Sequence, residues 1–179
     1  MPSPIAHLTA GYVVYRLSRN HEPKPSLRHP QWGPALLWLA GGFSLLPDID
    51  SAAGVLLGDF ARYHNNATHS LLVGTGIALG FAAVMKWRTG SFGFWFLFAL
   101  ACYNLHILMD AATWSRGVKA LWPLSDQRFL SPVYLFYGLH WSNGLASSKH
   151  LVTIATELAF AAVVLFPWWG WPRRAHIRP

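Results

Sequence analysis

Long apolar segments alternate with short polar ones along the whole chain. Continuous apolar runs cover Phe92–Ala112 and Leu151–Trp171, and a third helical segment runs from Thr68, its predicted cap, to Met85. Each run has close to the roughly 20 residues that a helix needs to cross the hydrocarbon core of a bilayer. The pattern therefore predicts helices that span a membrane.

Two further segments depart from a simple span. Ser3–Ser18 predicts a shorter helix with Ser3 as its N-cap and a proline in the first turn. Pro34–Leu57 is apolar but is interrupted by Pro47–Asp50, which indicates a broken helix or a re-entrant half. The expected fold is all-α: a polytopic membrane helix bundle of about four spans plus the N-terminal helix.

The connecting segments are polar or aromatic. Arg19–Gln31, Gly58–Ala67 and Lys86–Gly90 predict loops, because they lack an apolar period and carry proline, glycine or charge. Trp114–Lys149 is long and rich in aromatic residues, which favours a loop at the membrane interface, where Trp and Tyr prefer to lie. No internal repeat is visible, and we expect residues 1–179 to form a single domain.

Composition supports a membrane protein. The chain is 53% hydrophobic and 12% charged, whereas soluble domains carry about 25% charged residues. The net charge of +7 does not indicate nucleic-acid binding, because the basic residues lie at the edges of apolar segments. The expected partners are the lipid bilayer and a small-molecule or lipid substrate; no protein partner is indicated.

The distribution of Lys and Arg predicts the orientation. Nine of these residues fall in the 16–28 linker region, the 86–88 turn and the C-terminal tail. Five fall on the other side, at Arg62, Arg116, Lys119, Arg128 and Lys149. The positive-inside rule then places the N-terminal linker and the C-terminal tail in the cytoplasm of a bacterium, with the protein crossing its inner membrane several times.

Acids and histidines recur inside the apolar segments, where each is costly. His106 and Asp110 have i, i+4 spacing and so share a helix face. Asp48 and Asp50 follow Pro47, and in an extended stretch they would point the same way, toward a shared cation. The remaining candidates are His7, His64, His69 and Glu157.

The predicted topology brings these residues to one face of the membrane, the outer one. Each has a simpler interpretation alone: His7 as a hydrogen-bonding group between helices, Asp48 as a cap, Asp110 as a snorkelling side chain, or His106 with Asp110 as a structural pair. The whole set is better explained by a metal site. The mixed nitrogen and oxygen donors suit Zn and also Mn, Fe or Co, with roughly two or three ions per chain.

Five short motifs follow one another in a recognisable order: PIAH at 4–7, LLPDID at 45–50, THSLL at 68–72, HILMD at 106–110 and LWPLS at 121–125. Together they resemble the bacterial inner-membrane metal-dependent hydrolases (domain of unknown function 457), some of which are described as LexA-binding. The resemblance covers about residues 1–160. It implies seven metal ligands, His7, Asp48, Asp50, His64, His69, His106 and Asp110, and an acidic residue in the last helix, Glu157.

One departure from that family lies beside a ligand. The family shows His-Arg-Gly-x-Thr-His-Ser, whereas this chain carries Asn65 and Asn66 in place of the Arg and Gly. If that Arg contacts an anionic substrate, the substrate class or the activity differs here. A more distant likeness is to zinc-dependent phospholipase C, which is helical and also uses an N-terminal His and a His-x-x-x-Asp helix.

The expected function is hydrolysis by a metal-activated water, with Asp48 or Asp50 as bridging ligand or base and Glu157 as a further catalytic acid. A phosphoester or lipid head group is the expected substrate. The alternative is a metal-binding membrane protein without catalysis, either a transporter or a regulatory partner of the LexA type. A transporter should space polar residues across the whole membrane depth. His140 is left open, and four histidines are expected in solvent: His21, His29, His150 and His176.

Overall fold

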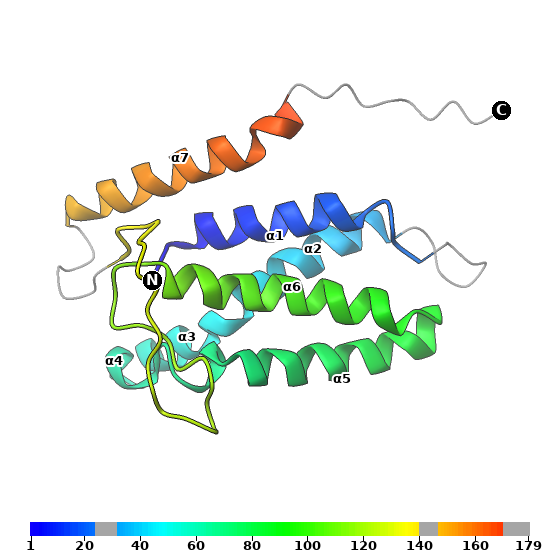
Figure 1. The fold of residues 1–179 in the computed structure, drawn as a ribbon, viewed down its shortest axis with the longest axis horizontal. Coiled ribbons are helices and arrows are strands. Elements are labelled where there is room, and N and C mark those ends of the chain that lie inside the picture. The colour runs from blue at the N-terminus through cyan, green and yellow to red at the C-terminus, as the bar shows by residue number, and fades with distance from the viewer. Residues whose placement is uncertain (24–31, 140–146, 170–179) are drawn as a thin grey trace.

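Helices account for all regular elements in the described parts of the chain, which are residues 1–23, 32–139 and 147–169 of a computed structural model. This confirms the all-α prediction. Figure 1 shows α1, α2, α5 and α6 side by side along the long axis, with α7 lying along α1. The elements are α1 (Pro4–Ser18), α2 (Gly33–Leu45), η1 (Leu46–Asp48), α3 (Ile49–Leu56), α4 (Phe60–Tyr63), η2 (Ala67–His69), α5 (Leu71–Thr89), α6 (Phe92–Ala111) and α7 (Lys149–Trp169).

Helix α1 begins as the sequence predicts. The Ser3 side chain accepts a hydrogen bond from the Ile5 backbone N–H, and Pro4 takes the first helical position, where no N–H partner is needed. The helix passes close to α2 at Gly11, where a Cβ atom would collide with the Ser44 hydroxyl. The close approach holds the two helices together near the end that carries His7.

The predicted break at Pro47 is present, but its shape differs from the prediction. Residues 46–48 form a 3₁₀ turn, and α3 follows directly, so Asp48 and Asp50 do not lie in an extended stretch. The 3₁₀ turn absorbs the proline, which has no N–H to donate. The two carboxylates nevertheless reach the same ring: Asp48 lies at His69 Nε2 and Asp50 at His69 Nδ1.

Helix α5 starts later than predicted. Its N-cap is Ser70, whose hydroxyl accepts from the backbone N–H groups of Leu72 and Val73. Thr68, the predicted cap, instead donates its hydroxyl to Asp50. The helix ends at Gly90 with φ of 74°, a left-handed C-cap that glycine adopts without strain.

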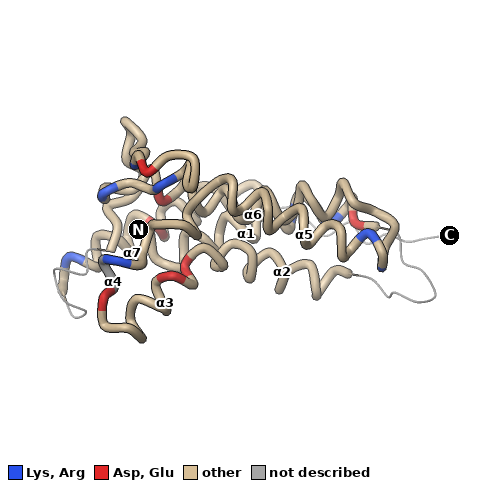
Figure 2. Tube along the Cα trace, turned by 90° about the horizontal axis from the view of Figure 1, so that it is seen from below, with Lys and Arg blue, Asp and Glu red and all other residues tan. Residues whose placement is uncertain are grey.

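The α5–α6 hairpin supplies two of the three described helices that are long and apolar enough to cross a membrane: Leu71–Thr89, Phe92–Ala111 and Lys149–Trp168. The predicted span over Pro34–Leu57 is divided into helices of 13 and 8 residues, each too short alone. Figure 2 shows Lys and Arg near the two ends of the bundle and uncharged helix between them. This distribution is typical of a bundle that crosses a membrane.

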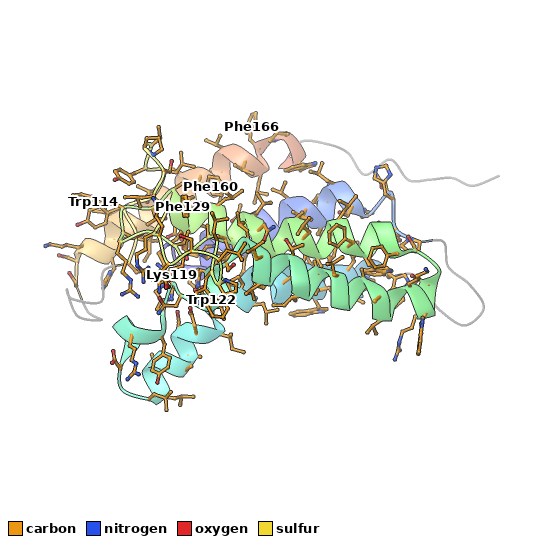
Figure 3. The ribbon with its side chains drawn as sticks, turned by 60° about the horizontal axis from the view of Figure 1, so that its bottom comes forward. Trp114, Lys119, Trp122, Phe129, Phe160 and Phe166 are labelled. Carbon is orange, nitrogen blue, oxygen red and sulfur yellow. The ribbon has the colours of Figure 1, made fainter. Side chains whose placement is uncertain are left out.

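An irregular segment of residues 112–139 covers one end of the bundle. Val118 and Phe129 pair their backbones in an antiparallel bridge, and Ser70 donates its hydroxyl to the Trp122 carbonyl. Figure 3 shows Trp114, Trp122 and Phe129 on this segment. The segment was predicted to lie at the membrane interface, and that location stays a prediction.

Candidate metal centre

Helix direction brings the predicted polar residues to one end of the molecule. Helices α1 and α5 begin at this end, while α2 and α6 finish there, as Figure 1 shows. The first turn of α1 therefore meets the last turn of α6. The residues that gather are His7 of α1, Asp48 of η1, Asp50 of α3, His64 after α4, His69 of η2, and His106 and Asp110 of α6.

Asp110 lies at the centre of this cluster and is fully buried. Its Oδ2 is 2.9 Å from His69 Nε2 and 3.6 Å from His106 Nε2. Its Oδ1 is 3.6 Å from His7 Nε2. The two oxygens of one carboxylate thus face nitrogens from three different elements.

The ligand atoms form two groups that share Asp110. One group is Asp48, His64, His69 and Asp110, and the other is His7, His106 and Asp110. Within each group the candidate ligand atoms all lie within 4.8 Å of one another. Either group could hold a metal ion.

The spacing fits a metal. Two atoms that are each 2.0–2.1 Å from a tetrahedral zinc ion lie roughly 3.4 Å apart. The nitrogen–oxygen contacts around Asp110 and Asp48 range from 2.9 to 3.7 Å. The 2.9 Å contact between His69 and Asp110 would also suit a hydrogen bond, but the other contacts, at 3.6 to 3.7 Å, are too long for one.

His7 supports the same interpretation. Both of its ring nitrogens are buried and lack a hydrogen-bond partner within the described ranges. The ring stacks on His106 at 3.6 Å between centroids, with 14° between the planes. A buried imidazole with no partner is costly as a structural element, whereas a metal would satisfy it.

Two of the histidines are oriented by hydrogen bonds that their Nδ1 atoms make on the side away from the cluster. His106 Nδ1 is 2.7 Å from the Ser44 carbonyl, so Nδ1 carries the proton and Nε2 presents a lone pair to the cluster. His69 Nδ1 lies 3.0 Å from Asp50 Oδ2, which likewise leaves its Nε2 facing Asp110. Carboxylate or carbonyl partners on the far nitrogen are the usual arrangement for metal-binding histidines.

Asp50 was predicted as a direct ligand that bridges metals or acts as a base, but it lies in neither ligand group. Its oxygens accept from the Nδ1 atoms of His64 (3.1 Å) and His69 (3.0 Å) and from the Thr68 hydroxyl. Burial acts to raise the pKa of Asp50, yet these hydrogen bonds outweigh it and hold the pKa below its ordinary value. The geometry makes Asp50 an orienting residue for two ligands.

Glu157 lies apart from both ligand groups. It accepts from the Ser3 backbone N–H at 2.6 Å and from the Ala6 N–H at 3.2 Å, and its other contact is the Ser3 hydroxyl. The carboxylate therefore caps the N-terminus of α1, the end that favours negative charge. Its predicted catalytic role stays a prediction that no contact in the structure supports.

Two arginines at this end were not predicted as part of the site. Arg128 donates to the Asn65 carbonyl at 3.1 Å and to the Asn66 side chain at 3.0 Å, and Arg116 donates to the His64 carbonyl. They hold the loop that carries His64. Backbone carbonyl contacts leave no signal in a sequence, since any residue offers a carbonyl.

The other histidines lie away from the cluster or outside the described residues. His21 is exposed, as predicted, while His150 is half-buried at the start of α7 rather than in solvent. His29, His140 and His176 fall outside the described residues.

The proteins that this chain resembles are inner membrane proteins, in agreement with the location predicted from the sequence. A family model described as YdjM inner membrane protein matches residues 1–174. The chain is also similar to inner membrane protein YbcI of Escherichia coli (strain K12), at 31% identity over 104 residues, which is 55% of this chain and 60% of that relative. No solved structure matches. The predicted bacterial inner-membrane family is confirmed, and hydrolytic activity, which these descriptions do not mention, stays a prediction.

Proposed function

The chain belongs to the YdjM inner membrane protein family, and on that premise we propose that it is a membrane-bound metal-dependent hydrolase of phosphoesters or lipid head groups. The observation that carries the proposal is the Asp110 carboxylate shared by two buried ligand groups. A carboxylate shared in this way is typical of hydrolytic centres with two ions.

The two groups differ in a way that suits catalysis. His7, His106 and Asp110 offer three protein ligands, which leaves a coordination position for water or substrate. Asp48, His64, His69 and Asp110 offer four. Mixed imidazole and carboxylate donors suit Zn, and also Mn, Fe or Co.

Bound divalent ions would supply Lewis acidity toward a phosphoryl oxygen and acidify a water molecule. Hydrolysis would form a P–O bond to the oxygen of a water molecule and break the P–O bond to the alcohol, which would leave with a proton. Asp48 Oδ1 faces His69 and His106, as a ligand atom would, so the other oxygen, Oδ2, would accept the proton from the water. Both oxygens of Asp50 are already engaged in hydrogen bonds, which makes Asp50 the less suitable base.

Access to the cluster also favours Asp48. Its side chain is 14% exposed, whereas those of His69 and Asp110 are fully buried. A substrate therefore reaches the site past η1 and the start of α3, where the neighbouring Ile49 is exposed. We predict that this opening faces the outer leaflet.

The non-catalytic alternative receives less support. A transporter needs polar groups along its path through the membrane, but the buried acids and histidines lie at one end of the bundle. Among the residues buried in α5, none is charged or a histidine. A regulatory partner of the LexA type would bind at the opposite end, and no described feature there indicates one.

A phosphodiesterase assay tests the proposal. Purified protein in detergent, loaded with Zn or Mn, should hydrolyse bis(p-nitrophenyl) phosphate, and a chelator should abolish turnover. Asp48→Asn should lower kcat by about 10²-fold or more, because a base is lost. The matched control Asp126→Asn, in an exposed ion pair with Lys119, should retain activity. Folded, metal-loaded protein that hydrolyses neither this ester nor phospholipid would favour the non-catalytic alternative.

A further inference from the structure

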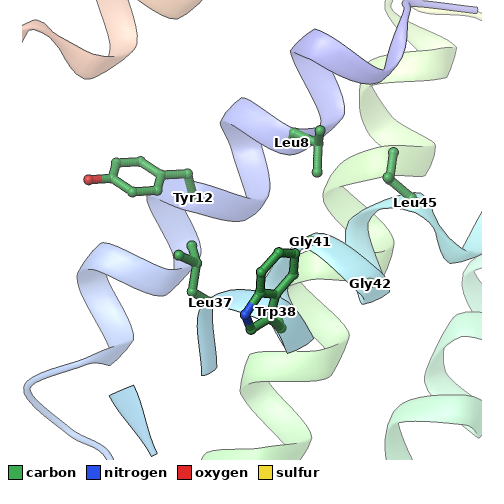
Figure 4. A pocket seen from close by; sticks show the side chains of 7 residues that line it. All are labelled: Leu8, Tyr12, Leu37, Trp38, Gly41, Gly42 and Leu45. Carbon is green, nitrogen blue, oxygen red and sulfur yellow. The ribbon is translucent and has the colours of Figure 1, made fainter. Parts of the chain in front are cut away.

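An apolar groove of about 580 Å³ runs between α1 and α2 on the outside of the bundle. Figure 4 shows its lining, with α1 on one side and α2 on the other. Trp38 is 81% exposed and Leu8 is 43% exposed. The lining residues are Leu8, Tyr12, Leu37, Trp38, Gly41, Gly42 and Leu45.

One end of the groove lies near the metal centre. Leu8 directly follows His7 in α1, and Leu45 comes three residues before Asp48. From Leu37 to Leu45 the lining extends about 12 Å along α2, a little over a third of a hydrocarbon core of about 30 Å. The end at Leu45 therefore borders the turn that carries Asp48, the least buried carboxylate among the candidate ligands.

The depth of the groove in the bilayer indicates what kind of molecule would occupy it. Both helices pack against α6, a candidate span, and run alongside it, so the groove lies at the depth of the bilayer. Lipid is the solvent at this depth, and an acyl chain has the shape and polarity of the groove. The glycine pair leaves room for it, because a Cβ atom at Gly42 would meet nothing within 4 Å.

We propose that this groove holds one acyl chain of a glycerophospholipid whose phosphodiester lies at the metal centre. The substrate class would then be membrane phospholipid rather than a soluble ester, an inference that rests on the proposed hydrolytic function. The groove would position the substrate more than it would raise the binding affinity. An acyl chain that moves from the bilayer into the groove gains little apolar burial, because the bilayer is already apolar. Position alone is worth much, because a displacement of about 1 Å costs roughly 10²-fold in rate.

Two glycine-to-leucine substitutions distinguish an effect of the groove from an effect of the lipid-facing surface in general. Gly42→Leu fills the groove without touching the core. Gly80→Leu is the matched control, because Gly80 is also an exposed helical glycine with nothing within 4 Å of its Cβ position. Both proteins would be reconstituted in phosphatidylglycerol vesicles, beside the wild type.

Turnover gives the first readout. Gly42→Leu should lower kcat/KM for phosphatidylglycerol about tenfold or more and leave bis(p-nitrophenyl) phosphate within about twofold, while Gly80→Leu changes neither. Equal effects of Gly42→Leu on both substrates, or no effect on either, would overturn the proposal.

Photolabelling gives a readout that does not need activity. A phosphatidylglycerol with a diazirine on one acyl chain should label residues 37–45 more strongly than the outer face of α5, and Gly42→Leu should remove the excess. Labelling equal on both helices, or cross-links between two copies of the chain at this groove, would overturn the proposal. If no substrate is hydrolysed but the labelling is as expected, only the proposed activity fails.

Discussion

Asp110 is the residue on which both ligand groups depend, because each of its oxygens faces a different set of histidines. Its charge is not balanced by a lysine or arginine: among the described residues, the ion-pair contacts of Asp48, Asp50 and Asp110 are all with histidines. A buried carboxylate left without compensation costs several kcal/mol. Bound cations would offset this cost.

Asp50→Asn tests the orienting role of that residue. Metal affinity should fall about 10–100-fold, because His64 and His69 lose the carboxylate that fixes their rings. The number of ions bound at saturating metal should not change. A competition titration against a chromophoric chelator measures both quantities. Loss of a whole equivalent at saturation would show that Asp50 is a direct ligand.

Glu157→Gln tests whether that residue caps α1 or takes part in catalysis. The substitution should lower the free energy of unfolding by about 1–3 kcal/mol, because buried hydrogen bonds to a charged acceptor are weakened. Metal content should stay unchanged. Thermal unfolding in detergent and elemental analysis check the two parts. If Glu157→Gln is as stable as the wild type but no longer hydrolyses substrate, Glu157 is catalytic rather than a helix cap.

At this scale the sequence identified which residues gather but not all the contacts that they make. His106 and Asp110 were predictable because i, i+4 spacing fixes their shared helix face. The role of Asp50 was not, because it depends on the 3₁₀ turn at Leu46–Asp48 rather than on spacing. The proton position on His106 depends on the Ser44 carbonyl, 62 residues away in the chain.

At the scale of elements, the α5–α6 hairpin is held by a close approach at Gly74. A Cβ atom there would lie 2.5 Å from Tyr103 Cδ1 and 2.6 Å from Asn104 Oδ1. Tyr103 in turn donates its hydroxyl to the Thr68 carbonyl, next to His69. The packing of the hairpin is thereby connected to the position of a ligand.

Gly74→Ala and Gly76→Ala form a matched pair that tests this packing. Both replacements gain roughly 1 kcal/mol of helix propensity. Gly74→Ala should nevertheless destabilise the protein by about 1–3 kcal/mol through overpacking, whereas Gly76→Ala, with open space around it, should not. The measurement is the melting temperature of each variant in detergent. Equal values for Gly74→Ala and Gly76→Ala would contradict the close approach at Gly74.

Element boundaries were predictable where a local signal exists. Ser3 and Pro4 mark the start of α1. The end of α5 was predicted at Met85, but the helix continues through the predicted turn to Thr89 and is capped by Gly90. The start of α5 was misplaced at Thr68 because Thr68 and Ser70 are both capable caps. The choice depends on Asp50, which takes the Thr68 hydroxyl through a contact between distant segments.

For the whole molecule, the alternation of helix direction gathers all seven predicted ligands at one end. The sequence predicted this gathering from topology alone, since successive helices must reverse direction. Orientation in the membrane stays a prediction from the charge asymmetry, which would put Lys86 and Arg88, in the last turn of α5, in the cytoplasm and the site outside.

Cysteine labelling tests the orientation. In a Cys102→Ser background, Asp126→Cys at the site end should react with a membrane-impermeant maleimide added to spheroplasts, because its side chain is 80% exposed. Trp87→Cys, at a position that is 95% exposed at the other end, should react only after lysis. The reverse pattern would place the site on the cytoplasmic face.

The metal content of the purified protein shows whether the buried histidines and carboxylates bind ions. Detergent-purified wild-type protein, Asp110→Asn and the control Asp126→Asn would be analysed by elemental mass spectrometry after loading with Zn or Mn. We expect about two equivalents in the wild type and the control, and nearly none in Asp110→Asn, because both groups lose their shared ligand. Folded wild-type protein without metal, or full metal content in Asp110→Asn, would contradict this expectation.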